Sequence, residues 1–342
     1  MMALPEEITF ILPTMNRRQY ICRAVESCLA CQSEQVSSRV LVIDGMSDDG
    51  SYELLRERYA GNPRVRILRY ERVGFQRTAY YGAMQVDTPY ATFMYDDDVL
   101  SPDFHKMFEG MLARGKDFVM GYASIHNVDE VYPFRPIRDF ELRPKHDLAM
   151  EYFGYDRDDL RFVVPVSPIC CIVTTGHLKK WVQFTQEYAS KAAIRHYYMI
   201  ERNIGPDIIL YLSAILKEEE TALVTPTVVG QLSTHPDSMS VGYGDRHLIT
   251  GYWFGKMWAF EEICRQGNRA AAARSAAFLL ALGASMLFRM PFSKDRRWFW
   301  SYGREILRVK WLALRYAGVI PLMREFLTTL RNWRARQAHP AR

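Results

Sequence analysis

The sequence lacks the short motifs that mark several large enzyme classes. Neither G-x-x-x-x-G-K-[ST] nor G-x-G-x-x-G occurs, which excludes a P-loop nucleotidase and a typical dinucleotide-binding enzyme. Neither G-x-S-x-G nor H-E-x-x-H occurs, which argues against a serine hydrolase of the α/β type and a zinc peptidase. Chemistry must therefore be sought in other residues.

Long apolar runs and cysteines are also few. The longest uncharged stretch in the C-terminal part, Ser275–Phe288, has 14 residues, whereas a membrane-spanning helix needs about 17–25, so we predict no transmembrane helix. Glu6 and Glu7 stand where a secretory signal would be basic and then apolar. Cys28 and Cys31 form a C-x-x-C without a second pair, so buried thiols in a cytosolic protein are favoured over a zinc site.

The composition is that of a globular protein with an uneven distribution of charge. The chain has 342 residues, is 49% hydrophobic and 24% charged, and is long enough for two domains. Residues 245–342 hold 18 Lys/Arg and 6 Asp/Glu, a balance of +12, which leaves −7 for residues 1–244 out of the total of +5. A basic C-terminal segment favours an anionic surface as partner; we expect membrane lipid and no nucleic acid.

Strand and helix patterns alternate through the first third of the chain. Short apolar runs predict strands, and apolar residues at helical spacing predict helices between them. This alternation is typical of βαβ units, and hence of a mostly parallel sheet flanked by helices. The predicted strands are 8–12, 39–43, 65–68, 91–95, 118–122 and 169–173; the predicted helices are 17–31, 51–59, 77–85 and 208–216; residues 132–146 are expected to be a loop.

Polar residues follow three of these strands, where parallel sheets bind ligands. They are Thr14–Asn16, Asp44 and Asp96–Asp98. Three adjacent carboxylates repel one another, and Mg²⁺ or Mn²⁺ is commonly held by one or two carboxylates plus phosphate oxygens. A solvated acidic turn is the alternative interpretation of Asp96–Asp98.

Three segments resemble the motifs of family 2 glycosyltransferases, which have the GT-A fold. Pro13–Arg17 is similar to the family's P-x-Y-N-R turn, Val42–Ser51 to its V-I-D-D-G-S-x-D-G-S stretch, and Asp96–Asp98 to its D-x-D motif. The resemblance covers about residues 8–105 well and fades towards residue 240. It implies an α/β fold of the GT-A (Rossmann-like) type, with the helical C-terminal region as an extension.

The resemblance also implies roles for individual residues. A nucleoside diphosphate sugar would be bound by Pro13, Thr14, Asn16, Arg17, Asp44, Arg77, Asp96 and Asp97, and the cofactor would be Mn²⁺ or Mg²⁺. Asp98 is the expected metal ligand, with Asp97 as the alternative, because the register of D-x-D within the three aspartates stays open. His235 would ligate the metal or bind the diphosphate, with Ser238 or Ser240 on phosphate; a surface histidine is the alternative.

Inverting transfer requires a base for the acceptor hydroxyl. The resemblance places it at Asp207, with Glu201 in reserve; a carboxylate favoured by the helix dipole is the other interpretation of Asp207. Two departures from the family pattern stand out. Gly45 replaces the second aspartate of the D-D-G-S stretch, and Pro206 replaces an acidic neighbour of Asp207.

The predicted function is metal-dependent, inverting transfer of a sugar to an acceptor hydroxyl of a glycan or lipid-linked acceptor, in cell-surface polysaccharide assembly. A nucleotidyl- or phosphosugar transferase on the same fold and a non-catalytic scaffold of a glycan assembly complex are the alternatives. We expect a catalytic domain over residues 1–240 and a helical region over 241–342.

The helical region favours a location in the cytoplasm, peripheral at the inner face of the cell membrane. Leu307, Trp311 and Leu314 share one helix face beside Arg308 and Arg315, which suits an interfacial helix on an anionic membrane. Packing of that helix on the catalytic domain is the alternative. The apolar stretch 275–288 also suits an interface in a homo-oligomer.

Overall fold

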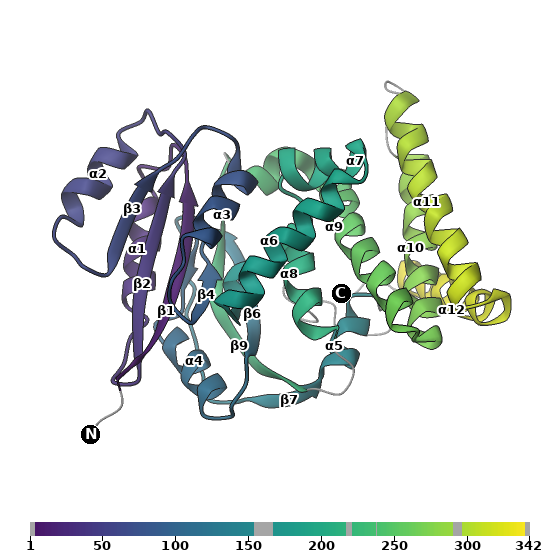
Figure 1. Cartoon of the computed structure of the whole chain (residues 1–342), viewed down its shortest axis with the longest axis horizontal. Coiled ribbons are helices and arrows are strands. Elements are labelled where there is room, and N and C mark those ends of the chain that lie inside the picture. The colour runs from purple at the N-terminus through teal and green to yellow at the C-terminus, as the bar shows by residue number, and fades with distance from the viewer. Residues whose placement is uncertain (1–3, 154–166, 217–220, 237, 290–295, 339–342) are drawn as a thin grey trace. The chain divides into compact units, whose positions relative to one another are not determined.

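The computed structural model describes residues 4–153, 167–216, 221–236, 238–289 and 296–338 (Figure 1). The described residues form two compact units. The sheet unit comprises Met1–Arg143, Pro165–Phe184 and Thr221–Gly242, and the helical unit comprises Pro144–Val164, Thr185–Glu220 and Tyr243–Arg342. The sheet unit thus ends close to the expected boundary at 240, but two segments inside residues 1–240 belong to the helical unit.

The sheet unit is built on nine strands in the order β3-β2-β1-β4-β8-β6-β9-β5, with β7 paired to β9. β1 is parallel to β2 and β4, and β2 is parallel to β3, whereas β8 is antiparallel to both β4 and β6. The strands are β1 Glu6–Thr14, β2 Val36–Asp44, β3 Val65–Arg69, β4 Tyr90–Phe93, β5 Val99–Leu100, β6 Phe118–Asn127, β7 Glu141–Pro144, β8 Cys171–Thr174 and β9 Thr221–Thr234. The expected α/β architecture with a central sheet is confirmed.

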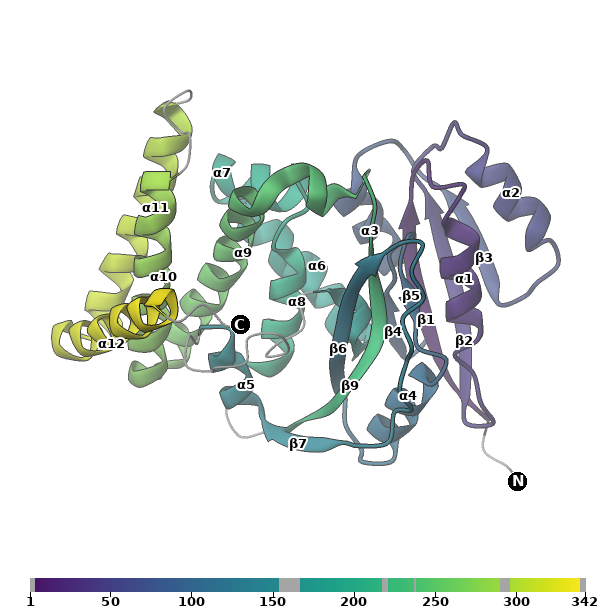
Figure 2. The same ribbon diagram turned by 180° about the vertical axis from the view of Figure 1, so that it is seen from behind.

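Helices cover both faces of the sheet (Figures 1 and 2). α1 and α4 bury their apolar sides against one face, while α3 and the first part of α6 lie on the other, where Trp181 meets Tyr80 and Phe93. Strands that are covered on both faces consist of continuous apolar runs, which is why the sequence pattern predicted β1 and β2. The helices are α1 Ile21–Leu29, α2 Ser51–Arg58, α3 Phe75–Met84, α4 Phe104–Leu112 and α6 Thr175–Ser190.

The prediction of a loop over residues 132–146 is wrong in its last part. Glu141–Pro144 forms β7 at the edge of the sheet, and α5 (Lys145–Glu151) starts directly after it. Three of the four β7 residues are exposed, so the strand shows no alternation of apolar and polar residues. Pro144 has no N–H to donate, which is tolerated at an edge strand and before a helix.

The helical unit is formed mainly by long helices. Trp253 is fully buried, and its indole N–H donates to the Leu279 carbonyl at 2.9 Å, which joins α9 to α10. α10 also packs against α11 and α12. The elements here are α5, the short α7 Ala193–His196 and η3 Tyr197–Glu201, then α8 Pro206–Ile215, α9 Met239–Gln266, α10 Arg269–Arg289, α11 Arg296–Tyr316 and α12 Val319–Ala338.

α10 contains the apolar stretch 275–288. Over Arg269–Leu287 this helix is long and apolar enough to cross a membrane by length and composition, with a mean hydropathy of 1.5. Of this apolar segment, 61% is buried inside the fold, and the core helices of soluble proteins can be equally long and apolar. Contacts with α9, α11 and α12 inside the helical unit account for this burial.

A network of buried charges joins three helices of this unit. The guanidinium of Arg195, which is 1% exposed, donates to Glu305 at 2.6 and 3.2 Å and lies 3.5 Å from Glu261. Arg308 donates to the same Glu261 at 3.0 Å, and the Arg195 guanidinium lies over the ring of Tyr188. Buried charges of this kind are stable only when they are paired, and here each carboxylate has a cationic partner.

The start of α8 packs closely on α9 through glycines. Gly205 has φ +101°, and a Cβ there would lie 2.3 Å from the Gly251 carbonyl oxygen. A Cβ on Gly251 would lie 2.2 Å from Cγ2 of Ile204, and one on Gly255 would lie 2.7 Å from the Gly205 carbonyl oxygen. Only glycines permit this approach, so the backbone just before Asp207 is fixed against α9.

All six cysteines are free thiols. Cys28 and Cys31 are buried in the core beneath β1 and β2, and burial raises the pKa of both thiols. The Cys31 thiol donates to the Ser27 carbonyl at 3.2 Å. A thiol held protonated in an apolar core is a poor metal ligand, so the interpretation as buried thiols is supported.

Candidate functional site

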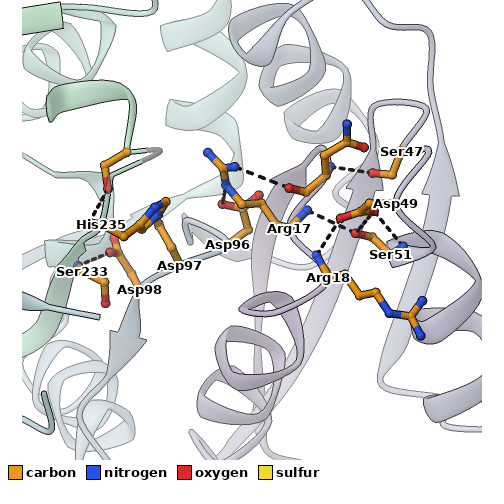
Figure 3. Close-up of polar contacts among 12 residues, drawn as sticks. Arg17, Arg18, Ser47, Asp49, Ser51, Asp96, Asp97, Asp98, Ser233 and His235 are labelled. Atoms are coloured by element: carbon orange, nitrogen blue, oxygen red, sulfur yellow. Dashed lines mark hydrogen bonds and ion pairs between the residues drawn. The ribbon is translucent and has the colours of Figure 1, made fainter. Parts of the chain in front are cut away.

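Two loops at the carboxyl ends of β1 and β2 are joined by hydrogen bonds. The Asn16 backbone N–H donates to Ser47 Oγ at 2.9 Å, and the Asn16 side chain exchanges two hydrogen bonds with Asp48. Asp49 accepts the backbone N–H groups of Arg18 and Ser51 at 3.0 and 2.9 Å (Figure 3). Asn16, at φ 56°, tolerates the left-handed conformation that this close junction needs. Asp48 and Asp49 therefore hold the loops together.

Asp44 ends β2 and is fully buried between these loops. Its Oδ2 accepts the Ser47 backbone N–H at 3.1 Å and lies 3.3 Å from Nε of Arg69. Its Oδ1 is buried and has no hydrogen-bond partner among the described residues. Thr14, which is aligned with Asp44 across the β1–β2 ladder, is also buried. An unpaired buried carboxylate oxygen is costly, so a ligand N–H or O–H is the natural donor for it.

Asp96 and Arg17 bring the β1 and β4 loops together. Nε of Arg17 lies 3.7 Å from Asp96 Oδ1 (Figure 3). Burial, and then the neighbouring Asp97, raise the pKa of Asp96 to about 7. A carboxyl pKa raised this far means that the positive charge around Asp96 does not offset the cost of burying its negative charge.

Asp97 contacts His235, which lies after β9 and 138 residues further along the chain. His235 Nε2 lies 2.9 Å from Asp97 Oδ2, and the imidazole packs on the ring of Tyr20 at 4.7 Å between centroids. His235 is 4% exposed, so it is not a surface histidine. Its Nδ1 is buried and has no partner within the described part of the chain.

Asp98 is buried, and its environment was not visible in the sequence. Its Oδ1 accepts the Ser233 backbone N–H at 2.8 Å, and burial together with Asp97 raises its pKa well above the ordinary value. Arg23 supports this turn by donating to the Asp97 carbonyl at 2.8 Å and to Ser233 Oγ at 3.1 Å. Arg23 lies on α1 beside apolar residues, and an isolated arginine there was the only signal in the sequence.

The donor set fits a divalent cation that shares its coordination with a ligand. No group of three His, Cys, Asp or Glu side chains capable of holding a metal alone occurs among the described residues. Asp96 and Asp98 flank Asp97 on one turn, and burial followed by the charge of Asp97 raises the pKa of both carboxyl groups. Mg²⁺ and Mn²⁺ sites completed by phosphate oxygens need only one or two protein carboxylates.

The proposed base lies in the helical unit. Asp207 is in the first turn of α8, accepts the Ile208 backbone N–H at 3.0 Å, and burial raises its pKa to about 7. Burial and then the charge of Asp207 also raise the pKa of Tyr252. The reserve candidate Glu201 is exposed and lies 3.9 Å from His196. Asp207, which is buried in the first turn of α8, is therefore a better candidate for the base than the exposed Glu201.

The remaining predicted residues differ in their surroundings. Pro13 and Thr14 are buried at the end of β1, whereas Arg77 is exposed on α3. Its neighbour Gln76 is 2% exposed, and Nε2 of Gln76 has no partner among the described side chains and backbone groups. Gln76 was missed because a glutamine in a helical pattern carries no signal. Ser238 Oγ accepts the His235 backbone N–H at 3.0 Å, and Asp237 lies outside the described residues.

Sequence comparison decides the family. Residues 9–181, just over half of the chain, match the profile "Glycosyl transferase family 2". The chain belongs to glycosyl transferase family 2. The match includes the Asp44 and Asp96–Asp98 loops, and it supports the expectation that the chain is a glycosyltransferase.

Solved structures with the same fold extend over nearly the whole chain. TarS 1–349 of S. aureus, in crystal structures with UDP-GlcNAc and with UDP, superposes with TM-scores of 0.59 and 0.58 at 15% identity. The first superposition covers 96% of this chain and 92% of that one. At this identity the likeness establishes the GT-A fold.

A curated relative is similar over a shorter segment. The chondroitin synthase of Escherichia coli is 25% identical over 122 residues, which is 36% of this chain and 18% of that protein. The chain therefore matches less than a fifth of that relative's length.

Proposed function

We propose that this family 2 glycosyltransferase moves a sugar from a nucleoside diphosphate donor to an acceptor hydroxyl in polysaccharide assembly. The observation that carries the proposal is the buried, unpaired Oδ1 of Asp44 after β2 together with the three carboxylates Asp96–Asp98 after β4, at the ends of the two strands that flank β1 in parallel. The UDP and UDP-GlcNAc complexes of TarS support a nucleotide-sugar donor, and the chondroitin synthase relative supports a polysaccharide product.

Each part of the proposed donor has a group suited to it. Asp44 accepts a hydrogen bond from the nucleobase or the ribose, and Asp96 orients the ribose. Arg17 belongs to the loop after β1 and lies 3.7 Å from Asp96 in the loop after β4. Asp98, with His235 or Asp97, would hold Mn²⁺ or Mg²⁺, and the ion would supply positive charge for the departing diphosphate. The Arg23 side chain and the Ser233 backbone hold the Asp97–Asp98 turn rigid, which keeps these groups positioned before the donor arrives.

Asp207 is proposed to remove the proton from the acceptor hydroxyl. The acceptor oxygen then forms a bond to the anomeric carbon while the bond from that carbon to the diphosphate oxygen breaks. The leaving electron pair stays on the nucleoside diphosphate, and the configuration at the anomeric carbon inverts. A base with a pKa of about 7 suits this role, because it accepts a proton better than an ordinary carboxylate does and a substantial fraction of it is ionised at neutral pH.

Thermal-shift measurements with UDP, GDP, CDP and dTDP, each with and without Mn²⁺, test the donor site. Ligand binding to the native state raises the melting temperature by an amount set by RT ln(1 + [L]/Kd). We expect a metal-dependent rise with one base, lost in Asp98→Asn and kept in Asp87→Asn, which changes an exposed aspartate of the same unit. The absence of a shift with every nucleotide would favour a scaffold.

Product analysis then separates the two enzymatic possibilities. Sugar transfer releases a nucleoside diphosphate, whereas transfer of a phosphosugar releases a nucleoside monophosphate. Release of the monophosphate would replace the proposed reaction by its alternative while leaving the donor site in place.

A further inference from the structure

Apolar side chains are exposed on the last two helices to an unusual degree. Of the sixteen exposed large hydrophobic residues in the described chain, eight lie on α11 and α12, which together contain 41 residues. Single exposed apolar residues are normal on a soluble protein, but a contiguous group marks a contact surface. The eight are Trp300, Leu307, Trp311, Leu314, Val319, Ile320, Met323 and Leu327.

α11 has two apolar faces, and only one is covered. Val309 and Ala313 are fully buried inside the helical unit. On the opposite side, Leu307 is 63% and Trp311 57% exposed, and Leu314 is also exposed. At 100° per residue these three lie within about 60° of one another around the helix axis. A helix that is covered on one side and apolar on the other presents its second face to a partner.

α12 continues this pattern after a tight turn. Gly318, at φ +86°, separates the two helices, and Leu322 is the buried contact of the first α12 turn. Ile320, Met323 and Leu327 are exposed at 82%, 52% and 49% and share one side of α12. We call the six residues Leu307, Trp311, Leu314, Ile320, Met323 and Leu327 the α11–α12 face.

Basic residues border this face. The segment Arg296–Ala338 contains ten Lys/Arg and two Asp/Glu. Arg324 is exposed on the same side of α12 as Ile320, and the Arg315 guanidinium lies 5.3 Å from the centroid of the Trp311 ring. One of the two acids, Glu305, is buried and paired with Arg195, and one of the ten cations, Arg308, is paired with Glu261, so the remaining charge of this segment is still strongly positive.

We infer that the α11–α12 face docks on the surface of an anionic lipid bilayer, with its apolar side chains in the headgroup boundary and its cations on phosphate groups. Tryptophan, leucine and isoleucine flanked by arginine and lysine are the residues of helices that lie in this boundary. Long arginine side chains bury their methylene groups while keeping their charge at the lipid phosphates. A second copy of the chain fits less well, because it would place one basic face against another, and interface cores are depleted in charge.

Vesicle flotation of the full chain tests the inference. We expect the chain to float with vesicles of phosphatidylcholine and phosphatidylglycerol, to bind pure phosphatidylcholine vesicles at least about tenfold more weakly, and to be released at about 1 M salt. Binding that is equal on both vesicles, or that resists salt, would overturn it, since a spanning α10 would behave in that way.

Matched variants assign the binding to the face. Trp311→Ser/Ile320→Ser should weaken binding to anionic vesicles at least about tenfold, whereas Ile125→Ser/Leu142→Ser, exposed apolar residues of the sheet unit, should not. Arg324→Glu should weaken binding and Arg66→Glu, exposed on β3, should not. Circular dichroism of each variant confirms its fold.

Two outcomes contradict the inference. Equal losses in the face variants and the controls would show that binding is not local to α11 and α12. A dimer in sedimentation of the free chain that is abolished by Trp311→Ser/Ile320→Ser would assign the face to a second copy instead.

Discussion

In the helical unit the buried guanidinium of Arg195 faces two carboxylates, each with a cationic partner. In the sheet unit Asp96, Asp97 and Asp98 crowd one turn, where Arg17 lies 3.7 Å from Asp96 and His235 lies 2.9 Å from Asp97. Burial raises the pKa of Asp96 and Asp98, so the cost of their charge is not offset within the protein. Paired charge indicates a structural role, whereas a buried carboxylate without a cationic partner among the described residues indicates contact with a ligand. Asp207 is a carboxylate of this second kind within the helical unit.

Replacing Asp207 gives the largest expected effect on activity. Asp207→Asn keeps the shape and the hydrogen bond to the Ile208 backbone but cannot accept a proton, so kcat should fall by about 10²–10⁴. Asp147→Asn, an exposed aspartate in the first turn of α5, is the matched control and should leave kcat unchanged. Equal kcat values for Asp207→Asn and the unchanged chain would remove Asp207 from the mechanism.

The same variant should be more stable above neutral pH. The pKa of Asp207 is raised to about 7, so the folded state binds the proton more tightly than the unfolded state does. This residue therefore costs stability as pH rises from about 4 to about 7, and the full cost is present above that range. Melting temperatures of the two proteins should agree near pH 4 and diverge by pH 8 in favour of Asp207→Asn. A lower melting temperature for the variant at pH 8 would mean that the carboxylate is structural.

Breaking the charge network around Arg195 should lower the stability of the protein, whereas Asp207→Asn should raise it above neutral pH. Arg195→Ala leaves Glu261 and Glu305 buried with less positive charge, and should lower the free energy of unfolding by about 3–5 kcal/mol in urea titrations. Arg265→Ala removes an exposed arginine that pairs with Glu262, and its effect should stay within about 0.5 kcal/mol. If Arg195→Ala cost no more than Arg265→Ala, the distinction between paired and unpaired charge would lose its energetic basis.

The smallest expected effect concerns how Asp207 is positioned. A Cβ on Gly251 would lie 2.8 Å from the Ile204 carbonyl oxygen as well as against its side chain, so Gly251→Ala must push the Asp207 backbone away from α9. We expect a loss of about 1–3 kcal/mol in stability and a lower kcat with the KM for the donor unchanged. Gly303→Ala on α11, where a Cβ meets nothing within 4 Å, should lower neither. A changed donor KM in Gly251→Ala would place the loop in the donor site.

The sequence predicted the parallel half of the sheet because strands covered on both faces are unbroken apolar runs. It could not predict β5 and β7, which have two and four residues with little apolar pattern, or the antiparallel placement of β8. The motif residues Asp44 and Asp96–Asp98 were found because they end strands.

The contacts that complete the site were beyond prediction. Arg23 and Ser233, which meet at the Asp97–Asp98 turn, are separated by 210 residues, and no local pattern connects them. The division of the chain between the two units was beyond prediction for the same reason. Residues 144–164 and 185–220 belong to the helical unit and residues 165–184 to the sheet unit, through contacts that depend on the finished fold.

The distribution of the free thiols also has a practical consequence. Cys22 alone among the six is partly exposed, while Cys28, Cys31, Cys170 and Cys171 are buried in the sheet unit and Cys264 in the helical unit. A maleimide dye should therefore attach at Cys22 in the native protein and reach the other positions only when their unit opens. Mass spectrometry of the labelled peptides during denaturation would then reveal which unit unfolds first, with no engineered probe.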